Sequence, residues 1–200
     1  MPSDISIVNQ ALGFLGASPI ISFDDDSKEA ALAKANYAPV RDAVLEAYNW
    51  TFATKWLAIP ALANPPLSEY ANAYQIPPDV LRILFVGQDY RNPSRDWRVE
   101  SGNIVTDDNA VKVQVVVTVT DPNKFSALFI QALAQRLAGD MAIALTSSRS
   151  LADFHYNVYQ QKLKDAVTRD GQQGQSRKIR SVWLRNARVG TGPSSSGPVV

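Results

Sequence analysis

The first apolar run of the chain has a helical period. Residues 4–15 follow Ser3, a possible N-cap, and the run stops before Gly16 and Pro19. Its helically spaced apolar residues are Ile5, Val8, Leu12 and Leu15. The pattern therefore predicts an amphipathic helix over residues 4–15.

A second, alanine-rich run extends from a possible N-cap at Ser27 to about Tyr48. The residues that it offers to one face are Leu32, Ala35, Val44 and Tyr48. Pro39 lies inside this run, and proline removes an amide donor and clashes with the preceding turn. The sequence allows a kinked helix or two shorter abutting helices, and we favour the kink.

Between residues 50 and 120 the pattern is typical of strands, because prolines become frequent and the apolar runs become short and β-branched. Residues 80–86 predict a buried strand, and residues 97–100 and 104–106 predict a hairpin around Ser101-Gly102-Asn103. Residues 111–119 predict another strand. One face of it carries Val111, Val113, Val115, Val117 and Val119, and the other carries Lys112, Gln114 and Thr118.

Helical spacing returns after Asp121-Pro122 and continues to a Ser/Thr cluster at 146–148. The stripe of this helix consists of Phe129, Leu133, Leu137, Met141 and Leu145. A last helix is predicted from about residue 150 to 169, closing at Asp170-Gly171, with Leu151, Phe154, Val158 and Ala166 as its apolar positions.

This order of elements predicts an α+β fold: a helical bundle of about four helices with an inserted β region and an extended C-terminal arm. Residues 1–171 form a single domain, with a helical body at 1–49 and 121–171 and a β insertion at 50–120. Residues 172–200 form the arm, which is rich in Gln, Gly, Ser and Arg.

The residue composition and the motifs argue against several kinds of catalytic and metal site. The chain has no cysteine and one histidine, and it contains no nucleophile elbow, zinc-protease helix, phosphate loop or dinucleotide fingerprint. We therefore expect no enzyme activity, no cofactor, no metal and no catalytic residue. His155 is interpreted as a packing or surface residue. Asp24, Asp25 and Asp26 resemble a cation site, but their place before a helix start favours an interaction with the helix dipole.

Membrane association is also not expected. The N-terminus lacks the positive region of a signal peptide and carries Asp4 and Asn9 among its apolar residues. No apolar stretch in the sequence approaches the roughly 18 to 20 residues that cross a bilayer.

Charge is unevenly distributed along the chain. Residues 1–170 hold 15 basic and 19 acidic residues, a net charge of −4, whereas residues 171–200 hold five basic residues and no acid, a net charge of +5. The arm mixes these cations with an aromatic and aliphatic residues. Its candidate partner-binding residues are Arg177, Lys178, Ile179, Arg180, Val182, Trp183, Leu184, Arg185 and Arg188.

Three interpretations of the arm stay open. Its cations could contact phosphates while Trp183 stacks on a base, or its apolar residues could dock in a groove of a partner protein, or it could be a solvated tail. Because buried aromatic residues supply most of the affinity of protein interfaces, Trp183 beside Leu184 favours protein docking.

Several blocks of the sequence resemble the tail tubular protein A family, the head-to-tail adaptors of short-tailed bacteriophages. The blocks are NQALGFLGASPIISFDDDSKEAALAKANYAPVRDAVLEAYNWTFATKWLAI, YANAYQIPPDVLRIL and WRVESGNIVTD. They cover about residues 5–120 in order, and the similarity continues more loosely after Asp121. The arm and Pro39 depart from the family pattern.

The resemblance implies a non-catalytic structural protein of the virion, assembled in the host cytoplasm. Such a subunit belongs to a homo-oligomeric ring of about twelve copies between the portal protein and the tail nozzle, around a channel for double-stranded DNA. Two other functions stay open: a nucleic-acid-binding protein that uses the arm, and a tail-associated polysaccharide hydrolase, which requires two converging carboxylates.

Overall fold

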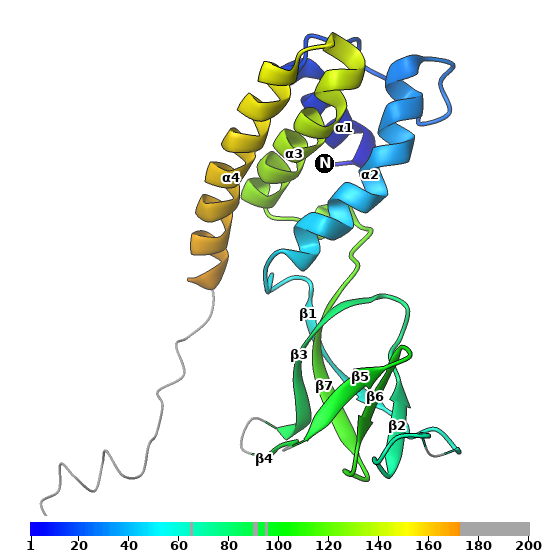
Figure 1. Cartoon of the computed structure of the whole chain (residues 1–200). Helices are drawn as coiled ribbons and strands as arrows, with labels where there is room; N and C mark the ends of the chain where they lie inside the picture. Colours follow the sequence, from blue (N-terminus) through cyan, green and yellow to red (C-terminus); the bar gives the residue numbers. More distant parts are fainter. Residues whose placement is uncertain (65, 90–91, 95, 173–200) are drawn as a thin grey trace, which may run out of the picture.

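The protein has the predicted α+β fold, and in its described residues four helices and two small antiparallel sheets form separate parts of the molecule (Figure 1). The computed structural model describes residues 1–64, 66–89, 92–94 and 96–172. We call the four helices the helical body. They are α1 (Asp4–Phe14), α2 (Lys28–Glu46), α3 (Ala127–Thr146) and α4 (Arg149–Gly171). The strands between α2 and α3 form the β module.

Helix α1 begins and ends as the sequence predicts. Ser3 and Ser6 form a reciprocal capping box, in which each hydroxyl accepts a hydrogen bond from the other residue's backbone N–H. After the helix, Gly16 adopts a left-handed φ of 67°, and Ala17 N–H closes the turn on the Leu12 carbonyl at 3.0 Å. The side chain of Asn9 then holds the following loop by two 2.8 Å hydrogen bonds to the backbone of Ile20.

Helix α2 starts after the predicted N-cap Ser27 and continues through Pro39 as one helix that changes direction along its length (Figure 1). Pro39 itself is exposed. The kinked interpretation is therefore the correct one of the two. The predicted face was partly wrong, because Ala35 is exposed and the buried face is centred on Tyr37 instead. Tyr37 Oη donates to Asp4 Oδ1 at 2.6 Å and so ties α2 to the start of α1.

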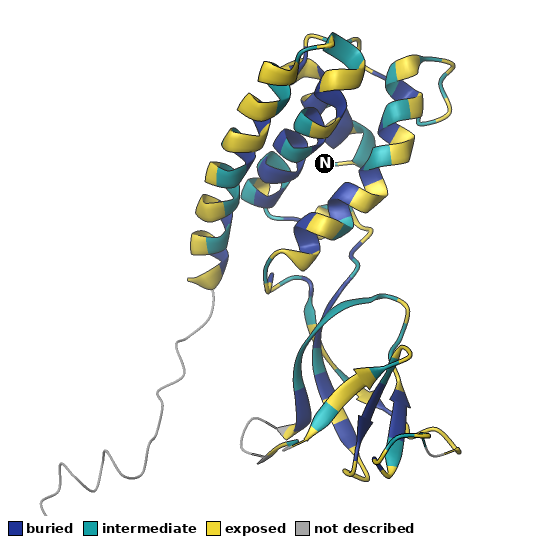
Figure 2. Ribbon diagram, viewed as in Figure 1, coloured by how far each residue is buried: buried dark blue, intermediate teal, exposed yellow. Residues whose placement is uncertain are grey.

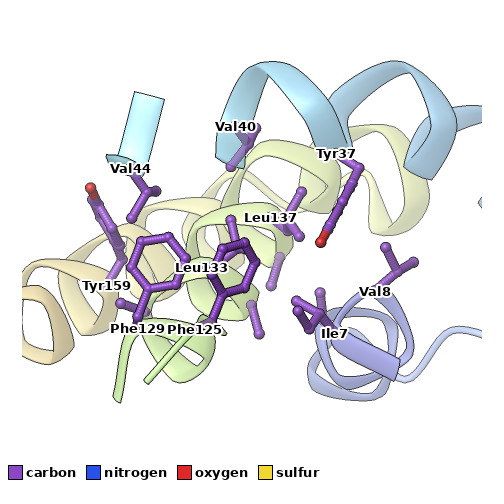
Figure 3. Close-up of a cluster of buried hydrophobic side chains, with 14 of the residues drawn as sticks. Ile7, Val8, Tyr37, Val40, Val44, Phe125, Phe129, Leu133, Leu137 and Tyr159 are labelled. Atoms are coloured by element: carbon purple, nitrogen blue, oxygen red, sulfur yellow. The ribbon is translucent and has the colours of Figure 1, made fainter. Parts of the chain in front are cut away.

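Helix α3 is the centre of the helical body, and α1, α2 and α4 each pack against it. The predicted stripe is buried from Phe129 to Met141, and only Leu145 at its end is partly exposed. Side chains from all four helices meet in this core (Figure 3). The exposed residues of the four helices lie mostly on the outer faces of these helices (Figure 2).

By length and composition, α3 is the one helix in the described part of the chain that could cross a membrane. This corrects the expectation that no apolar stretch approaches that length. Half of its apolar window is buried inside the protein, as in the core helix of a folded domain, so the match is weak evidence for a membrane span.

Helix α4 extends the predicted last helix slightly at both ends and is capped by Ser148. Its buried positions are His155, Tyr159, Ala166 and Asp170. The expectation for Phe154 was wrong: its side chain is 58% exposed.

The described residues of the β module form seven strands in two antiparallel sheets. The first has the order β1-β7-β3-β4 and the second the order β2-β6-β5. The strands are β1 (Thr54–Ile59), β2 (Asn72–Gln75), β3 (Val80–Asp89), β4 (Asn92–Pro93), β5 (Trp97–Glu100), β6 (Asn103–Thr106) and β7 (Val111–Val117).

The predicted hairpin is β5-β6, in which Glu100 pairs with Asn103 around Ser101 and Gly102. Both turn residues have positive φ values, 49° and 78°, which give the tight two-residue connection. Other predictions need correction. Strands β1 and β2 were not predicted, and β3 is only partly buried over residues 80–85. Strand β7 ends at Val117, so Val119 contributes to the core of the helical body instead.

The two sheets face each other across a separate apolar core. It contains Ile59, Tyr74, Val86, Ile104, Val111, Val113, Val115 and Val117. The sheets are linked where Ala61 bridges to Tyr74, and where Ser94 Oγ lies 3.0 Å from Thr106 Oγ1. The helical body and the β module therefore have largely separate cores.

Candidate interaction surfaces

The arm that the sequence singles out lies outside the described residues. All nine of its candidate partner-binding residues, from Arg177 to Arg188, fall in that part of the chain. The structure does place the point from which the arm starts, because α4 ends at Gly171, beside the boundary between the helical body and the β module.

The end of α4 is fixed to that boundary by a buried carboxylate. Asp170 is 3% exposed and accepts hydrogen bonds from Thr51 N–H at 2.9 Å and from Thr51 Oγ1 at 2.8 Å. Thr51 lies in the segment that leads from α2 into β1. The last helix and the entrance of the β module therefore hold each other in place.

An aromatic cluster fills the same boundary. Trp50 is completely buried, and its Nε1–H donates to the Val44 carbonyl at 2.9 Å. Its ring lies edge-on to Phe129, with ring centroids 5.0 Å apart, and is stacked on Phe52 at 5.9 Å. Phe125 closes the cluster, 4.8 Å from Phe129. Because both connections between the two parts contribute rings to this cluster, we call it the aromatic junction.

Polar contacts surround the aromatic junction on the side of the β module. Asp79 is central to them: its carboxylate lies 2.9 Å from Lys55 Nζ, and its carbonyl accepts from Thr118 N–H at 2.8 Å. A pocket of about 270 Å³ opens nearby and is lined by residues of both connections, including Lys124, and by Lys55 of β1. These contacts favour a fixed junction over a free hinge.

The loop between β1 and β2 lies at the end of the β module far from the helices (Figure 1), and it carries exposed apolar side chains. Leu67 is fully exposed and Leu62 is 41% exposed, both in the loop between β1 and β2. An apolar pocket of about 400 Å³ lies next to Leu62 and is bounded on its other side by Ile76, Pro77 and Pro78. Exposed leucines beside an apolar pocket are typical of a docking surface for another protein.

His155 packs inside the helical body, which is one of the two places that the sequence left open. It is 4% exposed, and its Nδ1 lies 2.8 Å from Gln135 Oε1 on α3. Its ring stacks on Phe14 of α1, with centroids 5.9 Å apart. Burial lowers the pKa of the imidazole, and the backbone of Phe14 opposes that shift. Its Nε2 is buried without a hydrogen-bond partner among the described residues.

Two of the three aspartates before α2 form local contacts. Asp24 binds Lys34 at 2.7 Å, and this hydrogen bond holds the pKa of Asp24 below its usual range. Asp25 Oδ2 accepts from the N–H groups of Ile21 and Ser22. Residues 1–64, 66–89, 92–94 and 96–172 contain no group of three or more acidic or histidine side chains arranged to hold a metal.

A hydrolase site requires two carboxylates that converge in a cleft. Of the pocket at the aromatic junction and the two pockets beside residues 58–61, only the first includes an acid, Asp121. Asp121 already accepts hydrogen bonds from the backbone and the side chain of Asn123, and the backbone bond lowers its pKa. These pockets therefore do not offer the pair of carboxylates.

Sequence reasoning missed the aromatic junction and the link between Asp170 and Thr51. Asp170 was interpreted only as the end of the last helix, and Trp50 only as the start of the β region. One signal was present: two aromatic residues, Trp50 and Phe52, occur within three positions at the change of pattern, where a loop is usually polar.

No protein-family model matches the chain, and no curated protein matches it.

Proposed function

We propose that this protein is a structural head-to-tail adaptor of a short-tailed bacteriophage. It forms a ring of about twelve copies between the portal protein and the tail nozzle, around the channel through which double-stranded DNA leaves the capsid. In this role the chain catalyses nothing and carries no cofactor. The proposal begins from the sequence blocks that resemble the tail tubular protein A family.

One observation supports the proposal most: the chain is built as two parts that are joined by the packed aromatic junction and have unlike surfaces. The helical body lies at one end, and the β module at the other exposes Leu62 and Leu67 in the loop between β1 and β2. An adaptor has to contact one protein above and a different protein below. The aromatic junction supports this role because it transmits a fixed orientation from one end to the other.

The starting point of the arm fits the same role. It begins beside the junction, where α4 ends, and we infer that the 28 residues beyond Gln172 contact surfaces outside this subunit. In the proposed ring, Trp183 and Leu184 dock on a neighbouring subunit or on the portal, and the cations fix the register.

The experiment mixes the full-length chain with purified portal protein and follows ring formation by negative-stain electron microscopy. Two full-length variants are compared, one with Trp183→Ala and Leu184→Ala, the other with its five arm cations changed to Gln. We expect rings with the wild type and loss of rings with the apolar variant. Wild-type protein that forms no ring with the portal contradicts the proposed function.

Salt distinguishes this function from nucleic-acid binding by the arm. Binding to DNA through five cations weakens steeply between 50 and 200 mM salt, on the order of a hundredfold or more, because condensed counterions are released. Docking through Trp183 and Leu184 is comparatively tolerant of salt. A gel shift that depends on residues 172–200 and disappears at high salt supports the DNA-binding alternative.

A further inference from the structure

The helical body has two unlike outer edges. Helices α2 and α4 both pack against α3 and lie on opposite sides of it (Figure 1). Both run from the end of the body far from the β module toward the junction. The outer surfaces of α2 and α4 are exposed along most of their lengths (Figure 2).

The α2 edge is acidic toward its C-terminal end. The last two turns of α2 carry Asp42 and Glu46, and the neighbouring cation, Arg41, is buried and bound to Asp42 at 2.9 Å. The last turn of α2 holds no basic residue, and Glu46 is exposed there without an ion pair among the described residues. A carboxylate at the negative end of a helix dipole is unfavourable by itself. Arg82 of β3 donates instead to Asn49, just beyond the helix.

The α4 edge is basic toward the same end of the body. Lys162, Lys164 and Arg169 lie in its last three turns, with Asp165 as the one exposed acid among them. Lys164 and Arg169 are exposed, and neither forms an ion pair with another described residue. The arm, with its charge of +5, continues from this end. The exposed ring of Phe154 adds apolar surface to α4.

We propose that α4 of one subunit docks on α2 of a second copy of this chain, with Lys164 and its neighbouring cations facing Glu46. We assign another copy of this chain as the partner of the α2 edge for one reason. The complementary charges lie on opposite edges of the same molecule, and both lie toward the end of the helical body that meets the junction. An interface between two different edges is heterologous, and a heterologous interface repeats around a ring. This inference rests on the proposed ring function and assigns the surfaces that build it.

Charge reversal tests the pairing in the full-length protein. Glu46→Lys alone and Lys164→Glu alone each place like charges across the interface, so we expect each to weaken self-association about tenfold. Lys112→Glu, an exposed charge reversal on the β module, is the matched control and leaves assembly unchanged. Sedimentation velocity over a range of concentrations measures association, with and without portal protein.

Restoring assembly by combining the two charge reversals is the decisive experiment. An equimolar mixture of the two single variants offers opposite charges at every interface of an alternating ring, and the double variant restores the pair within one chain. We expect both to assemble like the wild type. If the wild type assembles but the single variants assemble equally well, or if neither combination restores assembly, the α2–α4 interface is overturned while the adaptor function stands. If the wild type does not assemble at all, both proposals fail.

Discussion

Asp170 and Thr51 lie 119 residues apart in the sequence and are joined by two hydrogen bonds from the backbone and the hydroxyl of Thr51 to one carboxylate. The bonds connect the last residues of the helical body to the first connection into the β module. Because Asp170 is buried, this contact is shielded from competing water. It stabilises the junction together with the neighbouring aromatic rings.

Replacing Asp170 with alanine is expected to destabilise the protein by about 2–3 kcal/mol, because hydrogen bonds to a charged group contribute roughly 1.5–3 kcal/mol. Asp170→Asn keeps one oxygen acceptor and is expected to cost less. Urea denaturation followed by circular dichroism measures the free energy of unfolding. Asp165→Ala, the same change at an exposed position of α4, is the control. Equal stability of the Asp170→Ala and Asp165→Ala proteins contradicts this account of the junction.

Trp50→Ala is expected to cost about 3–5 kcal/mol, since it empties the centre of the aromatic junction and removes the bond to the Val44 carbonyl. Trp56 provides the comparison within the same chain. Because it is 41% exposed, Trp56→Ala is expected to reduce the free energy of unfolding clearly less than Trp50→Ala. Thermal unfolding of both variants measures the difference. A Trp50 variant as stable as the Trp56 variant indicates that the rings do not hold the two parts together.

The sequence predicts the helices well because their signals are local. Ser3, Ser27 and Ser148 each cap a helix, and the first two were identified from the residue type and the apolar run that follows. The β5-β6 hairpin was likewise predictable, because Ser101-Gly102 matches a tight turn between two short runs. Each of these features depends on residues only a few positions apart.

The features that were missed depend on distant partners. Strand β1 is recognisable only beside β7, where Leu57 pairs with Val113, because its own residues have no clean alternation. Phe154 was expected to be buried and His155 was compatible with either place, yet α4 rotates His155 toward Gln135 and leaves Phe154 outside. Helix rotation is decided by packing against α3, which one helix's pattern does not specify.

Ser101→Asn is expected to stabilise the β module by roughly 0.5–1 kcal/mol. Ser101 has a φ of 49°, in the left-handed region that costs most side chains energy and that asparagine tolerates better. Chemical denaturation measures the gain. Gly102→Val, at the next position, is expected to have the opposite effect. It puts a β-branched side chain at a φ of 78° and so destabilises the hairpin. A loss of stability in the Asn variant shows that the Ser101 side chain has another role.

The pH dependence of stability between pH 7 and 5 is expected to come from His155, the one histidine of the chain. Burial lowers its pKa in the folded protein below the ordinary value near 6.5, so the unfolded chain binds the proton more readily. The free energy of unfolding is therefore expected to fall as the pH drops from 7 through 6.5 toward the folded-state pKa. Asp24 and Asp121, whose pKa values are lowered, lose their contributions to stability only at lower pH, around and below 4.

Urea denaturation at a series of pH values measures how the free energy of unfolding changes with pH for the wild type and for His155→Gln. The variant is expected to be nearly independent of pH in this range, whatever its absolute stability, and a slope equal to that of the wild type contradicts the assignment.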